Sequence, residues 1–157
     1  YGAGEFGAQT AISMMSTYHK IVAFIDDDPI KHGKKLNNIK AIIIRTLPNL
    51  KGEVLNQNYN RNHNAFFSNE AIYYLKSLGI DHLIVDLPSI DKFNDGGSLG
   101  NHKIFWNLKE SPNYNTITEF AFIKNKIKDG VYLFSLNVLN LNLDASPSRP
   151  IIHPILK

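Results

Sequence analysis

Residues 68–86 read SNEAIYYLKSLGIDHLIVD, and this stretch decides the fold class. Ser68 is a favoured helix N-cap, and it predicts a helix over residues 69–78. Gly79 is a typical stop at the end of such a helix, and the apolar run over residues 82–86 then predicts a short buried strand. A helix followed at once by a buried strand favours an α/β fold.

A second strand precedes this helix. The apolar run over residues 41–45 ends at a turn, and the helix then crosses over to residues 82–86. Such a crossover predicts that the two strands pair in parallel. Farther along, we expect a helix or turn near residues 99–106, strands near residues 116–123 and 131–138, and a loop-rich tail over residues 141–157.

The first 40 residues have a different character. Gly2, Gly4 and Gly7 match the pattern G-x-G-x-x-G, and Asp26 follows the next apolar run, where a ribose-binding acid belongs. Glycines let the backbone approach a pyrophosphate, and a helix N-terminus supplies unpaired N–H donors for it. The segment also resembles the nucleotide-binding segment of polysaccharide-biosynthesis proteins related to nucleoside-diphosphate-sugar epimerases and dehydratases. Residues 1–40 therefore predict a partial Rossmann-like β-α-β segment, in which we expect a packing role and no NAD binding.

Six ordered blocks of sequence after this segment resemble the cyclase and kynurenine-formamidase (arylformamidase) family. The blocks read IIRTLPN from Ile43, GIDHLIVDLPSID from Gly79, NDGGSLGNHKIFW from Asn94, TITEF from Thr116, DGVYL from Asp129 and DASPSRP from Asp144. The resemblance implies that residues 41–157 form the C-terminal half of an incomplete swivelling β/β/α domain of the cyclase type. It also implies hydrolysis of a small amide, such as an N-formyl aryl amine, with one or two divalent metal ions, often zinc or manganese. Whether the chain forms a homo-oligomer is left open by the resemblance.

Carried over residue by residue, the resemblance puts two metal ligands on His102 and Glu119. An imidazole and a carboxylate together suit a hard or borderline divalent ion. The two residues are 17 positions apart (119 − 102) in a region rich in turn residues, so two separate elements must bring them together. The family's main metal motif, of the type His-x-Gly-Thr-His-x-Asp or Glu, is not found in the sequence. We therefore expect weak metal binding and no catalysis, and the sequence assigns no catalytic residue.

Composition argues against several classes of partner. The formal net charge of +3 comes from 17 basic and 14 acidic residues spread along the chain, so neither nucleic acid nor a membrane surface is expected to bind. No apolar run approaches the ~20 residues needed to cross a bilayer. The absence of cysteine excludes disulfides and thiolate metal sites and fits a reducing compartment, so we expect a cytoplasmic protein.

Several other polar residues are assigned to structure rather than to chemistry. Asp86, Ser89 and Asp91 surround a proline at a strand end, where such side chains fix a turn by bonding to the backbone. Asp95 is followed by two glycines and predicts a tight turn. The aromatic residues at 105–106 are expected in the core rather than around an aryl substrate.

Three hypotheses on function remain open. A metal-dependent amide hydrolase would need its missing ligands from another chain. A nucleotide-binding module of the sugar-epimerase type would be stabilised by NAD or by a nucleotide sugar. A non-catalytic chimera or fragment would be joined near residues 38–41, where the two resemblances meet, and we rank this hypothesis highest for the isolated chain.

The first prediction concerns the glycine motif. NAD at a millimolar concentration should leave the melting temperature of the protein almost unchanged, because the sequence lacks the further strands of a doubly wound domain that would support the motif. Thermal unfolding with and without NAD measures this. A clear rise in melting temperature that disappears in the variant Asp26→Ala would refute the expectation.

Overall fold

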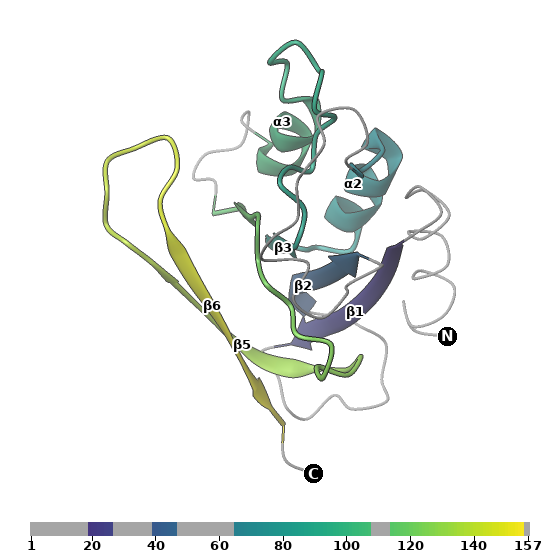
Figure 1. Ribbon diagram of the computed structural model, residues 1–157, viewed down its shortest axis with the longest axis vertical. Helices are drawn as coiled ribbons and strands as arrows, with labels where there is room; N and C mark the ends of the chain where they lie inside the picture. Colours follow the sequence, from purple (N-terminus) through teal and green to yellow (C-terminus); the bar gives the residue numbers. More distant parts are fainter. Residues whose placement is uncertain (1–18, 27–38, 47–64, 108–113, 156–157) are drawn as a thin grey trace.

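The computed structural model describes residues 19–26, 39–46, 65–107 and 114–155. The fold is mixed α/β, with a four-stranded sheet in the order β1-β2-β3-β4 and a separate two-stranded sheet, β5-β6 (Figure 1). The strands are β1 (His19–Asp26), β2 (Ile39–Thr46), β3 (His82–Val85), β4 (Thr116–Thr118), β5 (Tyr132–Val138) and β6 (Ser148–Pro154), and the helices are α2 (Asn69–Ser77) and α3 (Gly100–Trp106).

Three neighbouring strands of the larger sheet are parallel. Ala41 in β2 lies opposite His82 in β3, and His82 lies opposite Thr116 in β4. This confirms the parallel pairing predicted for residues 41–45 and 82–86. Because the three strands run the same way, the segments that follow them all leave from one edge of the sheet.

Helix α2 forms as its sequence predicts. The Ser68 hydroxyl accepts a hydrogen bond from the backbone N–H of Ala71 at 3.2 Å and satisfies a donor in the first turn. Leu78 caps the other end, and Gly79 follows it with a φ of 77°, in the left-handed region that glycine enters without a steric penalty. The N-cap and the stop therefore both lie where the sequence places them.

The larger sheet is covered on both faces. On one face its side chains pack against α2 and α3, and this core contains Ile42, Ile44, Ile72, Leu75, Leu83, Val85 and Phe105. On the other face, Ala41, Ile43 and Ile84 pack with half-buried residues of the β5-β6 sheet, which are Tyr132, Phe134 and Ile152. The layers are therefore helices, parallel sheet and hairpin, in that order (Figure 1).

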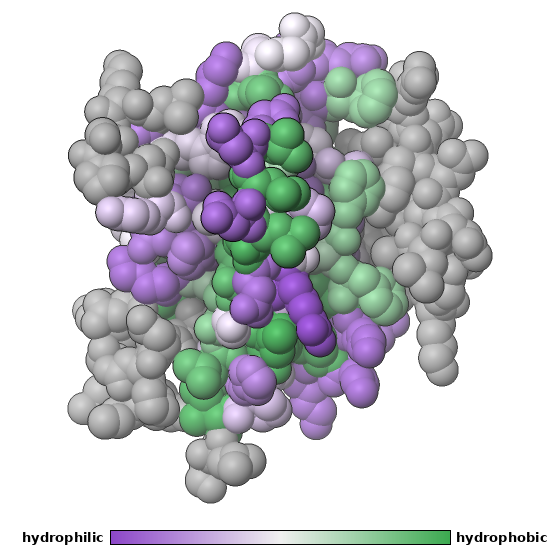
Figure 2. Space-filling model, turned by 90° about the vertical axis from the view of Figure 1, so that its left-hand side faces the viewer, coloured by the Kyte–Doolittle hydropathy of each residue, from purple (hydrophilic) through white to green (hydrophobic). Residues whose placement is uncertain are grey.

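Strands β5 and β6 form an antiparallel hairpin, in which Tyr132 pairs with Pro154 and Val138 with Ser148. The prediction of a strand near residues 131–138 is confirmed, whereas the predicted loop-rich tail is wrong over Ser148–Pro154. The prediction missed this strand because it contains Pro150 and Pro154, and proline is disfavoured in strands. A proline is tolerated in an edge strand where its missing N–H would point away from the partner strand. On the face that is on the left in Figure 1, apolar residues are interleaved with polar ones (Figure 2). The exposed apolar residues of β5 and the turn after it are Leu133, Val138, Leu139, Leu141 and Leu143.

Strand β4 is shorter than the sequence predicts. A strand was expected over residues 116–123, but β4 ends at Thr118. The chain turns there because Phe120 has a φ of 53°, which is incompatible with a strand. The turn places Glu119 at the edge of the sheet instead of within it.

The N-terminal predictions lie mostly beyond the described residues. Gly2, Gly4 and Gly7 are outside them, and Asp26 ends β1 opposite Ile39. Strand β1 pairs with β2 in antiparallel orientation, so one sheet contains residues from both sides of the predicted boundary at residue 40, which stays a prediction. Within the described residues, no helix has the length and apolar character needed to span a bilayer.

The core packing generates the second prediction. Replacing Leu75 with alanine should lower the free energy of unfolding by about 2–5 kcal/mol, because the fully buried side chain leaves a cavity between α2 and the sheet. Urea denaturation measures the loss. Tyr73→Ala on the same helix is the matched control, because Tyr73 is exposed and its removal should change the free energy by less than about 0.5 kcal/mol. Equal losses in both variants would contradict the described burial.

Candidate functional site

Three ionisable side chains meet at the edge of the sheet where the parallel strands end. Asp91 lies in the loop after β3, Glu119 directly follows β4, and His102 is in the first turn of α3. This edge is where α/β folds commonly place their functional groups, since the loops that follow parallel strands converge there. The structure thus brings together the two residues that the sequence singled out as metal ligands, and it adds the carboxylate of Asp91 beside His102.

The imidazole of His102 lies between two carboxylates. Its Nδ1 atom is 2.6 Å from Oδ2 of Asp91, and its Nε2 atom is 3.3 Å from Oε1 of Glu119. The side chain of His102 is 10% exposed and that of Glu119 is 25% exposed, so the pair lies just beneath the surface, whereas Asp91 is buried. Because Asp91 accepts from Nδ1, the Nε2 atom is the ring nitrogen that faces Glu119 and the solvent-accessible side of the site.

Backbone groups hold both carboxylates in place. Asp91 accepts a hydrogen bond from the N–H of Asn101 at 2.6 Å, and Glu119 accepts one from the N–H of Ile90 at 2.9 Å. The side chain of Asn101 in turn donates to the carbonyls of Phe67 and Ile90, at 2.7 and 2.9 Å. The site is therefore fixed by hydrogen bonds between four chain segments.

Aromatic residues form one side of the site. The ring of Trp106 meets the ring of His102 edge-on, with the centroids 5.0 Å apart and an interplanar angle of 65°. Phe105 is fully buried in the core, as predicted, and Trp106 is half-buried against that core. Trp106 thus limits the motion of the imidazole and its access to water.

Two residues with strained backbones flank the site. Leu99, three positions before His102, has a φ of 48°, and Phe120, next to Glu119, has a φ of 53°. Each non-glycine residue in this left-handed region costs about 1–2 kcal/mol. Because such strain persists only where surrounding contacts enforce it, and gathers at functional sites, it supports a role for this edge of the sheet beyond packing.

The two carboxylates control the charge of His102. Burial lowers the pKa of the imidazole, but the hydrogen bonds and charges of Glu119 and Asp91 outweigh burial, so the pKa of His102 is raised above its ordinary value. The two carboxylates therefore stabilise the imidazolium form of His102 relative to the neutral imidazole. A proton on Nε2 occupies the position from which this nitrogen would bind any other cation.

The arrangement also suits a metal ligand. A ligating histidine commonly donates its second ring N–H to a carboxylate, which fixes the tautomer and leaves the other nitrogen for the metal. Asp91 has this position relative to His102, and Glu119 is next to the free nitrogen. Among the described residues, no group of three or more His, Cys, Asp or Glu side chains is arranged to hold a metal ion. The described residues therefore bring two candidate ligands together, His102 and Glu119.

Ser89 and Asp95 bond to nearby backbone groups as predicted, whereas Asp86 bonds to the last residue of β2. Both carboxylate oxygens of Asp86 accept from the N–H of Thr46, at 3.0 and 2.9 Å, and the Ser89 hydroxyl accepts from the N–H of Asp91. The carboxylate of Asp95 accepts from the N–H groups of Gly97 and Leu99, both at 2.7 Å, and these bonds lower the pKa of Asp95.

Sequence reasoning missed the second role of Asp91. Asp91 was predicted to bond to the backbone of the turn around Pro88, but one of its oxygens accepts from the N–H of Asn101 in α3 and the other orients His102. A signal was available, because a histidine that binds a metal commonly has a carboxylate or carbonyl partner, and Asp91 lies in the loop that leads to His102. Nothing in the spacing of 11 residues between them (102 − 91) selects Asp91 over its neighbours.

No protein-family model matches the chain, and no curated protein matches it.

The charge balance generates the third prediction. In metal-free protein, Glu119→Gln should lower the pKa of His102, because one of its two carboxylate partners is lost. An NMR titration of the imidazole protons between about pH 5 and 9 measures this. Glu70→Gln is the control, since Glu70 is an exposed carboxylate in the first turn of α2 and should leave the titration unchanged.

The raised pKa of His102 also predicts how the free energy of unfolding depends on pH. A histidine whose pKa is raised on folding stabilises the protein fully below its unfolded pKa of about 6.5, and this contribution is lost as the pH rises through the raised value. The wild-type protein should therefore exceed Glu119→Gln in unfolding free energy by more at about pH 6 than at about pH 9. A difference that grows with pH would contradict the described geometry.

Proposed function

We propose that His102 and Glu119 bind a divalent metal ion, as part of an amide-hydrolysing site of the cyclase or kynurenine-formamidase type. The observation that carries this proposal is the position of His102, whose Nδ1 atom is bonded to Asp91 while its Nε2 atom faces Glu119 at 3.3 Å. A small amide, such as an N-formyl aryl amine, is the proposed substrate class.

The donor atoms fit such an ion. One neutral imidazole nitrogen and one carboxylate are ligands that zinc and manganese accept, and Asp91 supplies the partner that keeps the imidazole in the tautomer needed for coordination. The Oε1 atom of Glu119 that lies near Nε2 also accepts from the N–H of Ile90, which holds the carboxylate in place and leaves Oε2 without that bond. When bound, a divalent ion at such a site polarises a carbonyl and lowers the pKa of coordinated water.

The layered architecture also supports the proposal. The chain stacks two helices, a mainly parallel sheet and a two-stranded sheet in order, which is the succession that a β/β/α fold requires. We assign these layers to part of a swivelling β/β/α domain of the cyclase type. In this assignment, the site edge is formed by the loops after β3 and β4.

Two ligands set a limit on what this chain does alone. Catalytic zinc sites ordinarily use three protein ligands and keep one position for water. With only the two ligands that the described residues bring together, the chain should bind an ion weakly and should not hydrolyse amides, so we propose that the activity needs ligands from another chain.

The fourth prediction tests the ligand pair directly. Purified full-length chain should bind zinc or manganese weakly, and His102→Ala and Glu119→Ala should each weaken binding about tenfold or more, because each leaves a single ligand. Isothermal calorimetry measures the affinities. His153→Ala is the matched control, since His153 is an exposed histidine on β6 and its loss should change nothing. Equal weakening in all three variants, or in none, would rule out the proposed pair.

Activity provides the second readout. The chain supplied with zinc or manganese should hydrolyse N-formylkynurenine no faster than the metal alone. Hydrolysis that survives rigorous purification and is abolished by a chelator would show that the described chain completes its own site, and the two-ligand limit would then be wrong.

A further inference from the structure

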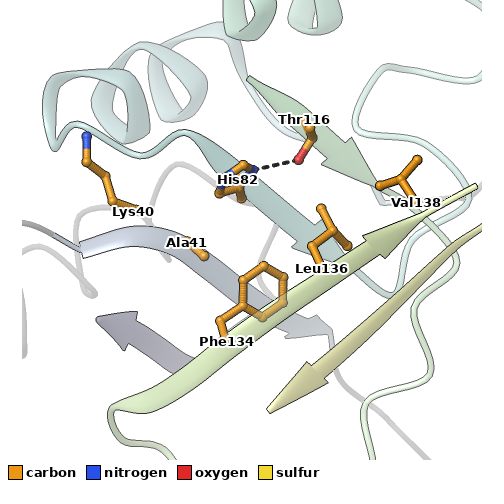
Figure 3. Close-up of a pocket in the computed structure, with 7 residues that line it drawn as sticks. All are labelled: Lys40, Ala41, His82, Thr116, Phe134, Leu136 and Val138. Carbon is orange, nitrogen blue, oxygen red and sulfur yellow. Dashed lines mark hydrogen bonds between the residues drawn. The ribbon is translucent and has the colours of Figure 1, made fainter. Parts of the chain in front are cut away.

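A cavity of about 400 Å³ lies at the other end of the parallel strands, between the sheet and β5 (Figure 3). Its walls come from the first residues of β2, β3 and β4 and from one side of β5. The residues that line it are Lys40, Ala41, His82, Thr116, Phe134, Leu136 and Val138. Its volume is within the range of about 300–1,000 Å³ that is usual for small-molecule sites.

This cavity is separate from the site around His102. His82 and Thr116 begin β3 and β4, whereas Asp91 and Glu119 follow the ends of the same two strands. The cavity and the His102 site therefore open at opposite edges of the sheet. Ligand binding in the cavity is therefore independent of the proposed metal site.

Most of the cavity wall is apolar, with one polar pair. Phe134, Leu136 and Val138 extend from β5 toward the sheet (Figure 3). Opposite them, Nδ1 of His82 is hydrogen-bonded to the hydroxyl of Thr116 at 2.8 Å. Within the described residues, the second ring nitrogen of His82 makes no hydrogen bond, so it is the polar atom that remains for a ligand.

The ring of Phe134 strengthens the case for an aromatic ligand. It lies 6.3 Å from the imidazole of His82, centroid to centroid, at an interplanar angle of 43°. Aromatic rings prefer tilted or offset neighbours at about 4.5–7 Å, so these two rings form part of a wall against which a third ring can pack.

The charges around the cavity select against ions. Burial lowers the pKa of His82, Asp81 partly opposes this, and the Lys40 ammonium lowers it further, so the imidazole is neutral near pH 7. Lys40 itself is paired with Asp81, with Nζ and Oδ2 2.9 Å apart. His82 and Lys40 therefore offer no unpaired positive charge for a carboxylate or phosphate. Asp81, the partner of Lys40, offers no unpaired negative charge.

We infer that this cavity binds a small uncharged aromatic molecule of one or two rings, which packs against Phe134 and Leu136 and forms a hydrogen bond with His82. The apolar walls supply most of the affinity, and the free imidazole nitrogen orients the ligand. Amides, phenols and indoles have the required combination of an uncharged ring and one polar group.

Chemical-shift mapping of the full-length chain tests this inference, with indole and benzamide as probes and benzoate as the charged counterpart of benzamide. Indole and benzamide should shift the backbone amide signals of residues around the cavity, and benzoate at the same concentration should not. The signals to follow are those of Ala41, His82, Thr116, Phe134 and Leu136. Shifts with benzoate equal to those with benzamide would overturn the charge argument.

Two variants block the cavity, and one controls for the added bulk. Leu136→Trp should fill the space and abolish the shifts, and Val138→Trp should do the same from the exposed rim if Leu136→Trp fails to fold. Leu133→Trp puts the same side chain on the outward face of β5, where Leu133 is 49% exposed, and should leave probe binding intact. Binding that survives both Leu136→Trp and Val138→Trp, or is absent in the wild-type protein, would overturn the inference.

His82→Phe separates the polar contact from the apolar packing. It keeps a ring in the wall but removes the nitrogen, so benzamide should bind about 2–10-fold more weakly, as expected for the loss of one net hydrogen bond. Unchanged affinity in this variant would show that His82 does not contact the ligand.

Discussion

The buried carboxylate of Asp91 is the constraint on which the described site depends. A charged group that leaves water must be paired and hydrogen-bonded, or it destabilises the fold strongly. Asp91 meets this need with the N–H of Asn101 on one oxygen and with the ring and N–H of His102 on the other. The loop after β3 and the start of α3 are consequently tied together by one side chain. Helix α3 has only seven residues and no side-chain N-cap, so this carboxylate supplies much of what fixes its first turn.

The same network extends from α3 to the rest of the core. Asn101 donates to the carbonyls of Phe67 and Ile90 and so joins α3 to the segment before α2 and to the loop after β3. Glu119 accepts from the N–H of Ile90 and adds the segment after β4. Four chain segments that are distant in sequence thereby share one set of polar contacts at the edge of the sheet. A change to any member should move the others, which is why the geometry around His102 is a property of the fold and not of one loop.

Local sequence rules predicted the elements whose causes are local. Ser68 as N-cap, the stop at Gly79 and the apolar run of β3 each act within a few residues, and these boundaries were predicted closely. The two wrong predictions, for β6 and for the end of β4, concern features that depend on residues distant in sequence. Strand β6 exists because β5 provides a partner across a long turn, although its prolines argue against a strand. The end of β4 depends on the left-handed backbone of Phe120, which bonds to Leu87 in another loop. For the site, the resemblance singled out two residues that the structure brings together, but no rule of spacing pointed to Asp91 as the partner of His102.

The hydrogen bond from His102 to Asp91 has two opposing effects on metal binding by His102. A carboxylate on Nδ1 makes the imidazole a better ligand, but together with Glu119 it also stabilises the proton on Nε2. A metal ion must displace that proton before it can bind, so its affinity falls as the pH falls. With only two ligands to offset this competition, proton binding by His102 should oppose metal binding strongly unless further ligands are added. The same pair of carboxylates therefore stabilises the protonated imidazole and should weaken the binding of the proposed metal ion.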